Sequence, residues 1–252
     1  MKIRFVTLNI WEGGRLFDNV VRFIKRENPD ILALQEVYDG KTSKFEKRFR
    51  TFEIFKKELG FSNSVFTPAF LDTQSIGDIE QGNAIFSKFP ILIQKAIFFD
   101  KSYSKLNGEN PENFELFPPI LLYVTIALRN IKLDIFNIHG IWGLDGKDNE
   151  RRLKMSTAII DHIKNKSNII LAGDFNVKPN TKTIQNIEKH LKNVFKGELK
   201  TTFNIKRKKI VSGYATAVVD MVFVSRHINI VEHYSPQVDI SDHLPLVCEL
   251  EI

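Results

Sequence analysis

Polar side chains suited to phosphate-ester chemistry follow apolar, strand-like runs at five points in this sequence. The five blocks are Thr7-Leu8-Asn9, Leu34-Gln35-Glu36, Asn137-Ile138-His139, Gly173-Asp174-Phe175-Asn176 and Ser241-Asp242-His243. Their carboxylates and carboxamides carry the oxygen ligands that a hard divalent cation prefers. Their two histidines can donate to anionic oxygens. Each block alone is a weak signal, but the whole set indicates metal-assisted attack of water on a phosphate ester.

The composition is typical of a soluble globular protein. The chain has 252 residues, 43% hydrophobic and 26% charged, which is enough to bury a substantial core. No apolar stretch approaches the roughly 20 residues of a membrane helix, and the first residues enter a strand-like pattern without an apolar signal core. Cys248 is the single cysteine, which excludes an internal disulfide. We expect a cytoplasmic monomer that forms one domain over residues 1–252.

The net charge of +6 and the isoelectric point near 9.2 leave two interpretations open. A basic protein attracts polyanions, so a nucleic-acid partner is one of them. Lysine, isoleucine, asparagine and phenylalanine are abundant throughout the chain, however, and such a general bias would produce the same charge.

The hydrophobic periodicity predicts alternating helices and strands. Helices are expected over residues 16–27, 45–59 and 149–166, with a shorter one that starts at the Thr181 cap. Strands are expected over residues 3–8, 31–34, 64–66, 84–87, 91–99, 121–128, 131–138, 169–172, 218–224, 228–232 and 246–250. Many strands with helices in separate regions predict an α/β fold of two packed sheets with helices on the outer faces. Residues 100–119 are the one long irregular stretch, and a loop of that length is often functional.

Six segments, in order, resemble the endonuclease/exonuclease/phosphatase superfamily. They are Thr-Leu-Asn-Ile-Trp, Leu-Gln-Glu-Val, Gly-Asn-Ala-Ile-Phe-Ser-Lys-Phe-Pro-Ile, Gly-Asp-Phe-Asn, Val-Asp-Met-Val-Phe-Val-Ser and Ser-Asp-His-Leu-Pro. The resemblance extends from Asn9 to His243. It implies a four-layer α/β/β/α sandwich, which agrees with the periodicity, and a hydrolase that uses Mg²⁺ or Mn²⁺.

The resemblance also implies how a metal would be held. Glu36 is the implied principal ligand, with Asn9 beside it and Asp242 near the ion. A cap on the following turn is the other interpretation of Glu36. Some relatives carry an aspartate two residues after the asparagine; this chain has Trp11 there, so that contact is absent.

Further roles are implied for the catalytic groups. Asp174 would position and deprotonate the attacking water, and Asn176 would donate to a phosphate oxygen; an Asx-type turn would also explain this pair. His243 would donate to the phosphate while the buried Asp220 holds its ring. His139 occupies a place where some members carry a phosphate-facing histidine, although a histidine at a strand end is often a core residue.

The substrate is the least determined property. Lys206-Arg207-Lys208-Lys209 is a basic run that either is solvated or holds a phosphate backbone. Trp142 and Arg151 are further candidates to line a substrate groove, and Asn83 is expected to hydrogen-bond His139. We expect a nuclease or a DNA end-processing or repair enzyme. A phosphatase or phosphodiesterase of a phospholipid or small phosphorylated metabolite is the alternative, and an inactive binding protein of this fold is a third.

Overall fold

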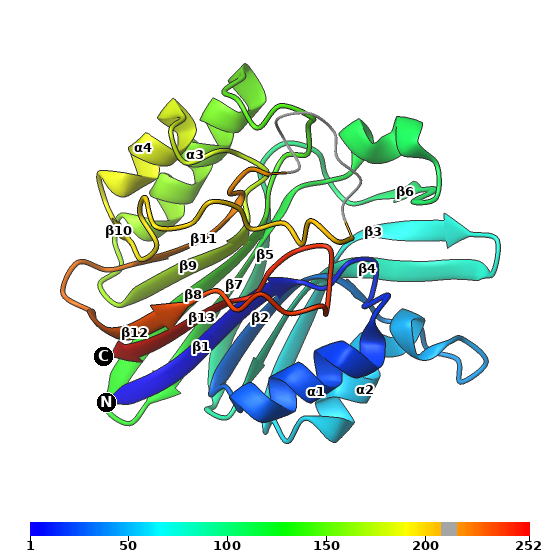
Figure 1. The fold of residues 1–252 in the computed structure, drawn as a ribbon, viewed down its shortest axis with the longest axis horizontal. Coiled ribbons are helices and arrows are strands. Elements are labelled where there is room, and N and C mark those ends of the chain that lie inside the picture. The colour runs from blue at the N-terminus through cyan, green and yellow to red at the C-terminus, as the bar shows by residue number, and fades with distance from the viewer. Residues whose placement is uncertain (208–215) are drawn as a thin grey trace.

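Two β-sheets packed face to face form the centre of the protein, and helices cover the outer face of each (Figure 1). The computed structural model describes residues 1–207 and 216–252, so Lys208 and Lys209 lie outside the described residues. The layers confirm the predicted α/β/β/α sandwich. No helix in the described part of the chain is long and apolar enough to cross a membrane.

The first sheet has the strand order β12-β13-β1-β2-β4-β3-β6. These strands are β1 (Lys2–Asn9), β2 (Ile31–Tyr38), β3 (Asn63–Gln74), β4 (Gly77–Ser87), β6 (Ser104–Leu106), β12 (Asn229–Tyr234) and β13 (Leu246–Glu251). Its outer face is covered by α1 (Phe17–Glu27) and α2 (Thr51–Glu58), with the 3₁₀ helix η1 (Lys47–Arg50) leading into α2.

The second sheet has the order β10-β11-β9-β8-β7-β5. These strands are β5 (Ile91–Phe98), β7 (Ile120–Leu128), β8 (Ile131–His139), β9 (Ile169–Asp174), β10 (Lys192–Asn193) and β11 (Asp220–Val224). Helices α3 (Glu150–Ile163) and α4 (Lys182–Glu188) cover its outer face. The Thr181 side chain accepts from the N–H of Ile184, which confirms the predicted cap of α4.

Three apolar layers hold the sandwich together. Side chains such as Phe5 and Ile135 fill the space between the sheets. Val20 of α1 packs with Leu32 in the layer under the first pair of helices, and Ile159 of α3 lies in the layer under the second. Burying one such side chain contributes roughly 1.5–3 kcal/mol to the stability of the folded state. Many such side chains hold the sheets and helices together as one support for the strand ends.

Strand register brings the polar ends of the strands together. In the first sheet β1 and β2 are parallel, and Asn9 pairs with Gln35, the residue before Glu36. In the second sheet β8 and β9 are parallel, and His139 pairs with Asp174. Antiparallel β11 places Asp220 on the other side of Asp174. Because parallel strands end at the same edge of a sheet, these polar residues gather at one edge of the sandwich.

The chain between residues 45 and 87 differs from the sequence-based prediction. The single helix predicted over residues 45–59 is wrong: a turn at Phe45 precedes η1 and then α2. Phe45 packs with Phe49 and Tyr38 in a separate small cluster, which removes it from the apolar face of α2. Strands β3 and β4 are also much longer than predicted, because their polar outer halves form a hairpin that projects past the sheet (Figure 1).

The stretch at residues 100–119, predicted to be irregular, contains two short elements. β6 adds to the edge of β3, and the 3₁₀ helix η2 (Pro111–Leu116) follows it. This stretch therefore lies beside the projecting β3–β4 hairpin.

Candidate active site

Two imidazole rings face the same carboxylate oxygen. The Nε2 atoms of His139 and His243 each lie 3.8 Å from Oδ2 of Asp174. The Asn9 amide donates to that oxygen over 3.3 Å, and the Asn176 N–H donates to Oδ1 over 2.8 Å. Asp174 and His243 are buried, whereas the side chain of His139 is 25% exposed and reaches the surface. This arrangement places two imidazole rings around a group that can accept a proton from water.

His243 is held by a buried aspartate. Its Nδ1 lies 2.8 Å from Oδ2 of Asp220. Burial alone would lower the pKa of His243, but the charges of Asp220, Asp242 and Asp174 outweigh it and raise that pKa to about 9. Burial raises the pKa of Asp220 even though His243 opposes the shift. The residue before His243 lies in a bend ahead of β13, so adjacent side chains need not alternate between the two faces of a strand.

The Glu36 carboxylate is fixed by two donors. Oε1 accepts from the Asn9 amide over 2.9 Å, and Oε2 accepts from the Glu12 N–H over 2.7 Å. The side-chain oxygen of Asn9, Oδ1, accepts from the N–H of Trp11 over 3.1 Å. In this geometry Asn9 presents its NH₂ group to Glu36 and Asp174. It therefore orients the two carboxylates, while its side-chain oxygen faces the Trp11 N–H.

A cation fits the chemistry of this site. The Glu36 and Asp174 carboxylates share the Asn9 amide, and Asp242 lines the same pocket as Glu36, so this concentration of negative charge would repel a phosphate ester unless a positive charge intervened. Glu36 and Asp242 both line the open pocket, and such oxygen ligands suit a hard divalent ion that keeps several waters. Ligand atoms of Asp174, Asp220 and His243 also lie within 4.8 Å of one another, but the hydrogen bond from His243 to Asp220 already occupies that buried group.

Backbone strain is concentrated at the same place. Among the described residues, positive φ angles outside glycine occur at Trp11 (61°), Glu12 (46°), Glu36 (58°) and Asn176 (55°), and elsewhere only at Asn28 and Arg129. A left-handed conformation is unfavourable for such residues and persists only where the surrounding structure imposes it. Strain of this kind clusters at functional sites.

Buried amides join the two sheets behind the site. Gln35 donates to Oδ1 of Asn137 over 2.6 Å, and Asn137 donates to the carbonyl oxygens of Leu34 and Ala84. Asn83 was predicted to bond His139, and this is wrong in the structure: its amide donates to the carbonyl oxygen of Asn137 over 3.0 Å. Asn83 is fully buried and supports the contact between the sheets, away from the pocket surface.

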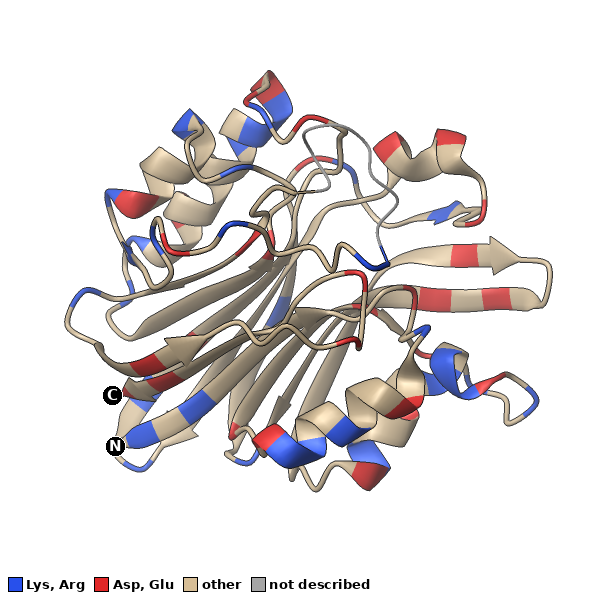
Figure 2. Ribbon diagram, in the orientation of Figure 1, with Lys and Arg blue, Asp and Glu red and all other residues tan. Residues whose placement is uncertain are grey.

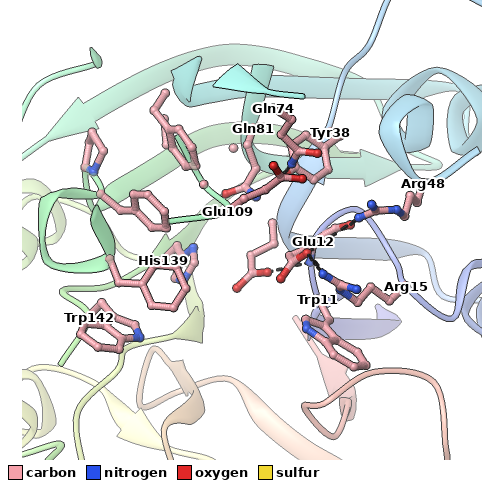
Figure 3. A pocket seen from close by; sticks show the side chains of 18 of the residues that line it. Trp11, Glu12, Arg15, Tyr38, Arg48, Gln74, Gln81, Glu109, His139 and Trp142 are labelled. Atoms are coloured by element: carbon pink, nitrogen blue, oxygen red, sulfur yellow. Dashed lines mark hydrogen bonds and ion pairs between the residues drawn. The ribbon is translucent and has the colours of Figure 1, made fainter. Parts of the chain in front are cut away.

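A pocket of about 410 Å³ opens beside these groups (Figure 3). His139, Glu36 and Asp242 form its catalytic side, and Trp142 lines it as the sequence analysis expected. Arg151 does not line it, because its guanidinium forms a double hydrogen bond with Asp100.

The described part of the basic run is partly neutralised. Arg207 pairs with Asp239, its Nε lying 2.7 Å from Oδ1, and Lys206 is exposed. Over the view of Figure 2, lysine and arginine are scattered over helices and loops, and acidic residues occupy the β3–β4 hairpin.

The sequence profile of the Endonuclease/Exonuclease/phosphatase family matches residues 6–243. The chain belongs to this family. No curated protein sequence matches it.

Solved structures confirm the fold of this family member. An endonuclease/exonuclease/phosphatase from Beutenbergia cavernae superposes with a TM-score of 0.75 at 20% identity, covering 100% of this chain and 72% of the other. A mannosyl-6-phosphatase from Bacteroides thetaiotaomicron gives 0.70 at 16% identity, with 99% and 100% covered. TDP2 of D. rerio, in complex with a single-stranded DNA product, gives 0.71 at 14% identity, with 100% and 99% covered. These likenesses establish a phosphoesterase fold that hosts different substrates.

Sequence reasoning missed most of the pocket wall. Glu12, Arg15 and Arg48 form one part of it, and Tyr38 and Gln74 form another. Burial and the neighbouring Glu36 raise the pKa of Glu12, against the lowering effect of Arg15 and Arg48. For Glu12, the sequence did hold a signal: the run Trp11-Glu12-Gly13-Gly14 follows the first polar block directly, and its glycines and charged residue interrupt the apolar pattern.

Proposed function

We propose that this protein is a divalent-metal-dependent phosphoester hydrolase that acts on nucleic acid or its nucleotides. One observation carries the proposal: two imidazole Nε2 atoms, of His139 and His243, lie 3.8 Å from one oxygen of Asp174. A phosphoryl group in this space would have a proton acceptor and two imidazole rings within reach.

The residues of the chain divide the reaction between them. Asp174 holds the attacking water through Oδ2 and accepts its proton as the oxygen–phosphorus bond forms. His243, kept protonated by Asp220, donates to a phosphoryl oxygen on which negative charge grows. His139 and Asn176 donate to the phosphoryl oxygens from the other sides. The bond from phosphorus to the ester oxygen breaks with its electron pair left on that oxygen, which takes up a proton from solvent water while Asp174 returns its proton to solvent.

A bound Mg²⁺ or Mn²⁺ would be held by Glu36 and Asp242, and it would supply positive charge to the phosphate and leaving oxygen. Asn9 and the N–H of Glu12 hold the Glu36 carboxylate toward the ion. The removal of either donor would loosen the ligand without changing the charge of the site.

The nucleic-acid substrate is supported by the family's phosphoesterase fold and by the charge of the whole chain, +6. The solved structures above include both a DNA complex and a sugar phosphatase. A phosphorylated metabolite or a phospholipid is accordingly the competing class, and the assay must contain both.

The test begins with bis-p-nitrophenyl phosphate, a diester that both substrate classes resemble chemically. We expect turnover that needs Mg²⁺ or Mn²⁺, falls at least tenfold in His243→Ala, and stays unchanged in His227→Ala, an exposed histidine at the surface. Single-stranded DNA, RNA, abasic duplex, sphingomyelin, a phosphoinositide and mannose 6-phosphate are then compared at equal concentration. Full activity in EDTA would refute the metal, and preferred turnover of a lipid or sugar phosphate would refute the nucleic-acid substrate.

A further inference from the structure

The pocket next to the catalytic groups has one aromatic wall. Phe70 of β3 stacks on Phe117 with ring centroids 4.6 Å apart, and Phe117 contacts Phe114 of η2 at 5.5 Å. Phe114 in turn meets the edge of Trp142 at 5.4 Å. All four rings line the pocket, so aromatic surface continues from the hairpin to the loop that follows His139.

This wall belongs to the folded framework. Asp72 is fully buried on the hairpin, and its carboxylate accepts from the N–H of Gly108 over 2.7 Å and from the Tyr38 hydroxyl. A Cβ atom at Gly108 would lie 2.6 Å from Asp72 Oδ2, so only glycine allows this close approach. The loop that carries Phe114 is therefore tied to the hairpin, and the wall needs no rearrangement to form.

The opposite wall is polar, but its groups bind one another. Arg15 donates to Glu12 over 3.0 Å, and Arg48 lies 3.8 Å from the same carboxylate oxygen. At the floor, the Gln74 amide donates to Asp72 over 2.6 Å and to Tyr38 over 2.8 Å.

These hydrogen bonds and ion pairs affect whether the pocket accepts a sugar ring or an aromatic base. A sugar with several hydroxyl groups would have to break such pairs or leave its own polar groups unsatisfied, and either choice costs free energy. A flat aromatic ring needs few hydrogen bonds and gains from stacking on any base-sized aromatic surface. The lining and the volume of about 410 Å³ suit a compact, mostly apolar ring with a few polar edges.

We propose that this pocket binds the base of a nucleotide, stacked on Phe114 with Trp142 beside it, while its phosphate lies at His139. The inference rests on the proposed phosphoester hydrolysis and narrows its substrate. A free nucleotide and the terminal nucleotide of a chain offer the same base and phosphate, so both sources satisfy it.

The two tryptophans of the chain make the test direct. The sequence contains only Trp11 and Trp142, and both line the pocket on opposite sides of the view in Figure 3. Intrinsic tryptophan fluorescence therefore reports on the pocket itself. We would titrate the full chain in Ca²⁺, in place of Mg²⁺, with AMP, UMP, ribose 5-phosphate, mannose 6-phosphate and inorganic phosphate.

We expect AMP and UMP to bind at least about tenfold more tightly than ribose 5-phosphate, because base stacking on aromatic side chains has about that effect. Phe114→Ala should weaken AMP binding about fivefold or more and leave ribose 5-phosphate unchanged. Leu116→Ala is the matched control, because Leu116 lies on the same 3₁₀ helix, is 45% exposed and does not line the pocket. Equal affinity for AMP and either sugar phosphate, or unchanged AMP binding in Phe114→Ala, would overturn the proposal.

Hydrolysis assays distinguish a free nucleotide from the terminal nucleotide of a chain. They also distinguish the proposed phosphoester hydrolysis from the proposed base binding. Phosphate release from AMP would identify a free nucleotide, and release of mononucleotides from a linear single strand would identify a chain end. Cleavage of a circular single strand as fast as a linear strand of the same sequence would overturn terminal binding. If base-selective quenching is observed but neither bis-p-nitrophenyl phosphate nor AMP nor a nucleic-acid strand is hydrolysed, the proposed function fails and the base pocket stands. Hydrolysis without base-selective quenching refutes the base pocket alone.

Discussion

Replacing Asp220 by asparagine is the most direct perturbation of His243, the proposed hydrogen-bond donor to the phosphate. The two side chains have the same shape, so the contact to Nδ1 of His243, now 2.8 Å, keeps its geometry while the negative charge is removed. Burial lowers the pKa of His243, and Asp220 is the largest of the charges that raise it to about 9. Asp220→Asn should therefore lower this pKa.

The size of the fall follows from the hydrogen bond. A hydrogen bond to a charged group is worth roughly 1.5–3 kcal/mol, and one pKa unit corresponds to about 1.36 kcal/mol. The pKa of His243 should fall by about one to two pH units. Since the wild-type pKa lies above the ordinary value of 6.5, this proton's contribution to folding is complete below about pH 6.5 and is lost as the pH rises through about 9.

Nuclear magnetic resonance titration of the histidine rings in metal-free protein measures the change directly. The chain has six histidines, and His243→Gln identifies the resonance of interest. Asp134→Asn is the control, because Asp134 is another buried aspartate, and it contacts Tyr123, Thr125 and Lys166 rather than a histidine. A His243 pKa that stays near 9 in Asp220→Asn would refute the assignment of Asp220 as the group that keeps His243 protonated.

Three further substitutions test separate parts of the site. Glu36→Gln should weaken Mn²⁺ binding by at least tenfold in calorimetry while the circular dichroism spectrum is unchanged, since it removes a charge and keeps the shape; equal Mn²⁺ affinity would exclude Glu36 as a ligand. Asp174→Asn should lower kcat on bis-p-nitrophenyl phosphate by roughly 100-fold or more, as expected for the loss of a general base, and a kcat within a few-fold of wild type would remove it from the reaction. Asp72→Asn should lower the free energy of unfolding in urea by about 1.5–3 kcal/mol through the loss of a charged acceptor, whereas Asp78→Asn, at an exposed pair on the same hairpin, should change it by less than about 1 kcal/mol.

The sequence predicted the centre of the fold well because strand ends and hydrophobic periodicity are local signals. The strands that end at Asn9, His139 and Asp174 are apolar runs closed by polar blocks, and parallel register then brings those blocks to one edge. The partnership of Asp220 with His243 joins a residue of β11 to a residue of the segment before β13, and it followed from the family resemblance alone. The structure shows that contact directly.

The walls of the pocket were not predictable by the same means. The outer halves of β3 and β4 mix buried apolar residues such as Phe70 and Ile79 with buried polar ones such as Asp72 and Gln81, so they lack the regular apolar and polar alternation that marks a half-buried strand. An aspartate carries no local signal of burial, yet Asp72 is fully buried against the Tyr38 hydroxyl and the loop at Gly108. Burial of that kind depends on contacts between segments that are 36 residues apart.

Trp11 stands where some relatives carry an aspartate, and it links the polar ends of the strands to the pocket. A carboxylate there would have added charge to a site that already holds Glu36 and Asp242. Trp11 instead places an aromatic ring in the pocket, with a guanidinium 5.4 Å from its centroid, while its N–H fixes the Asn9 amide that orients Glu36. The left-handed backbone at Trp11 accompanies both contacts, so one strained residue joins the orientation of Glu36, the proposed metal ligand, to the pocket proposed to bind the base.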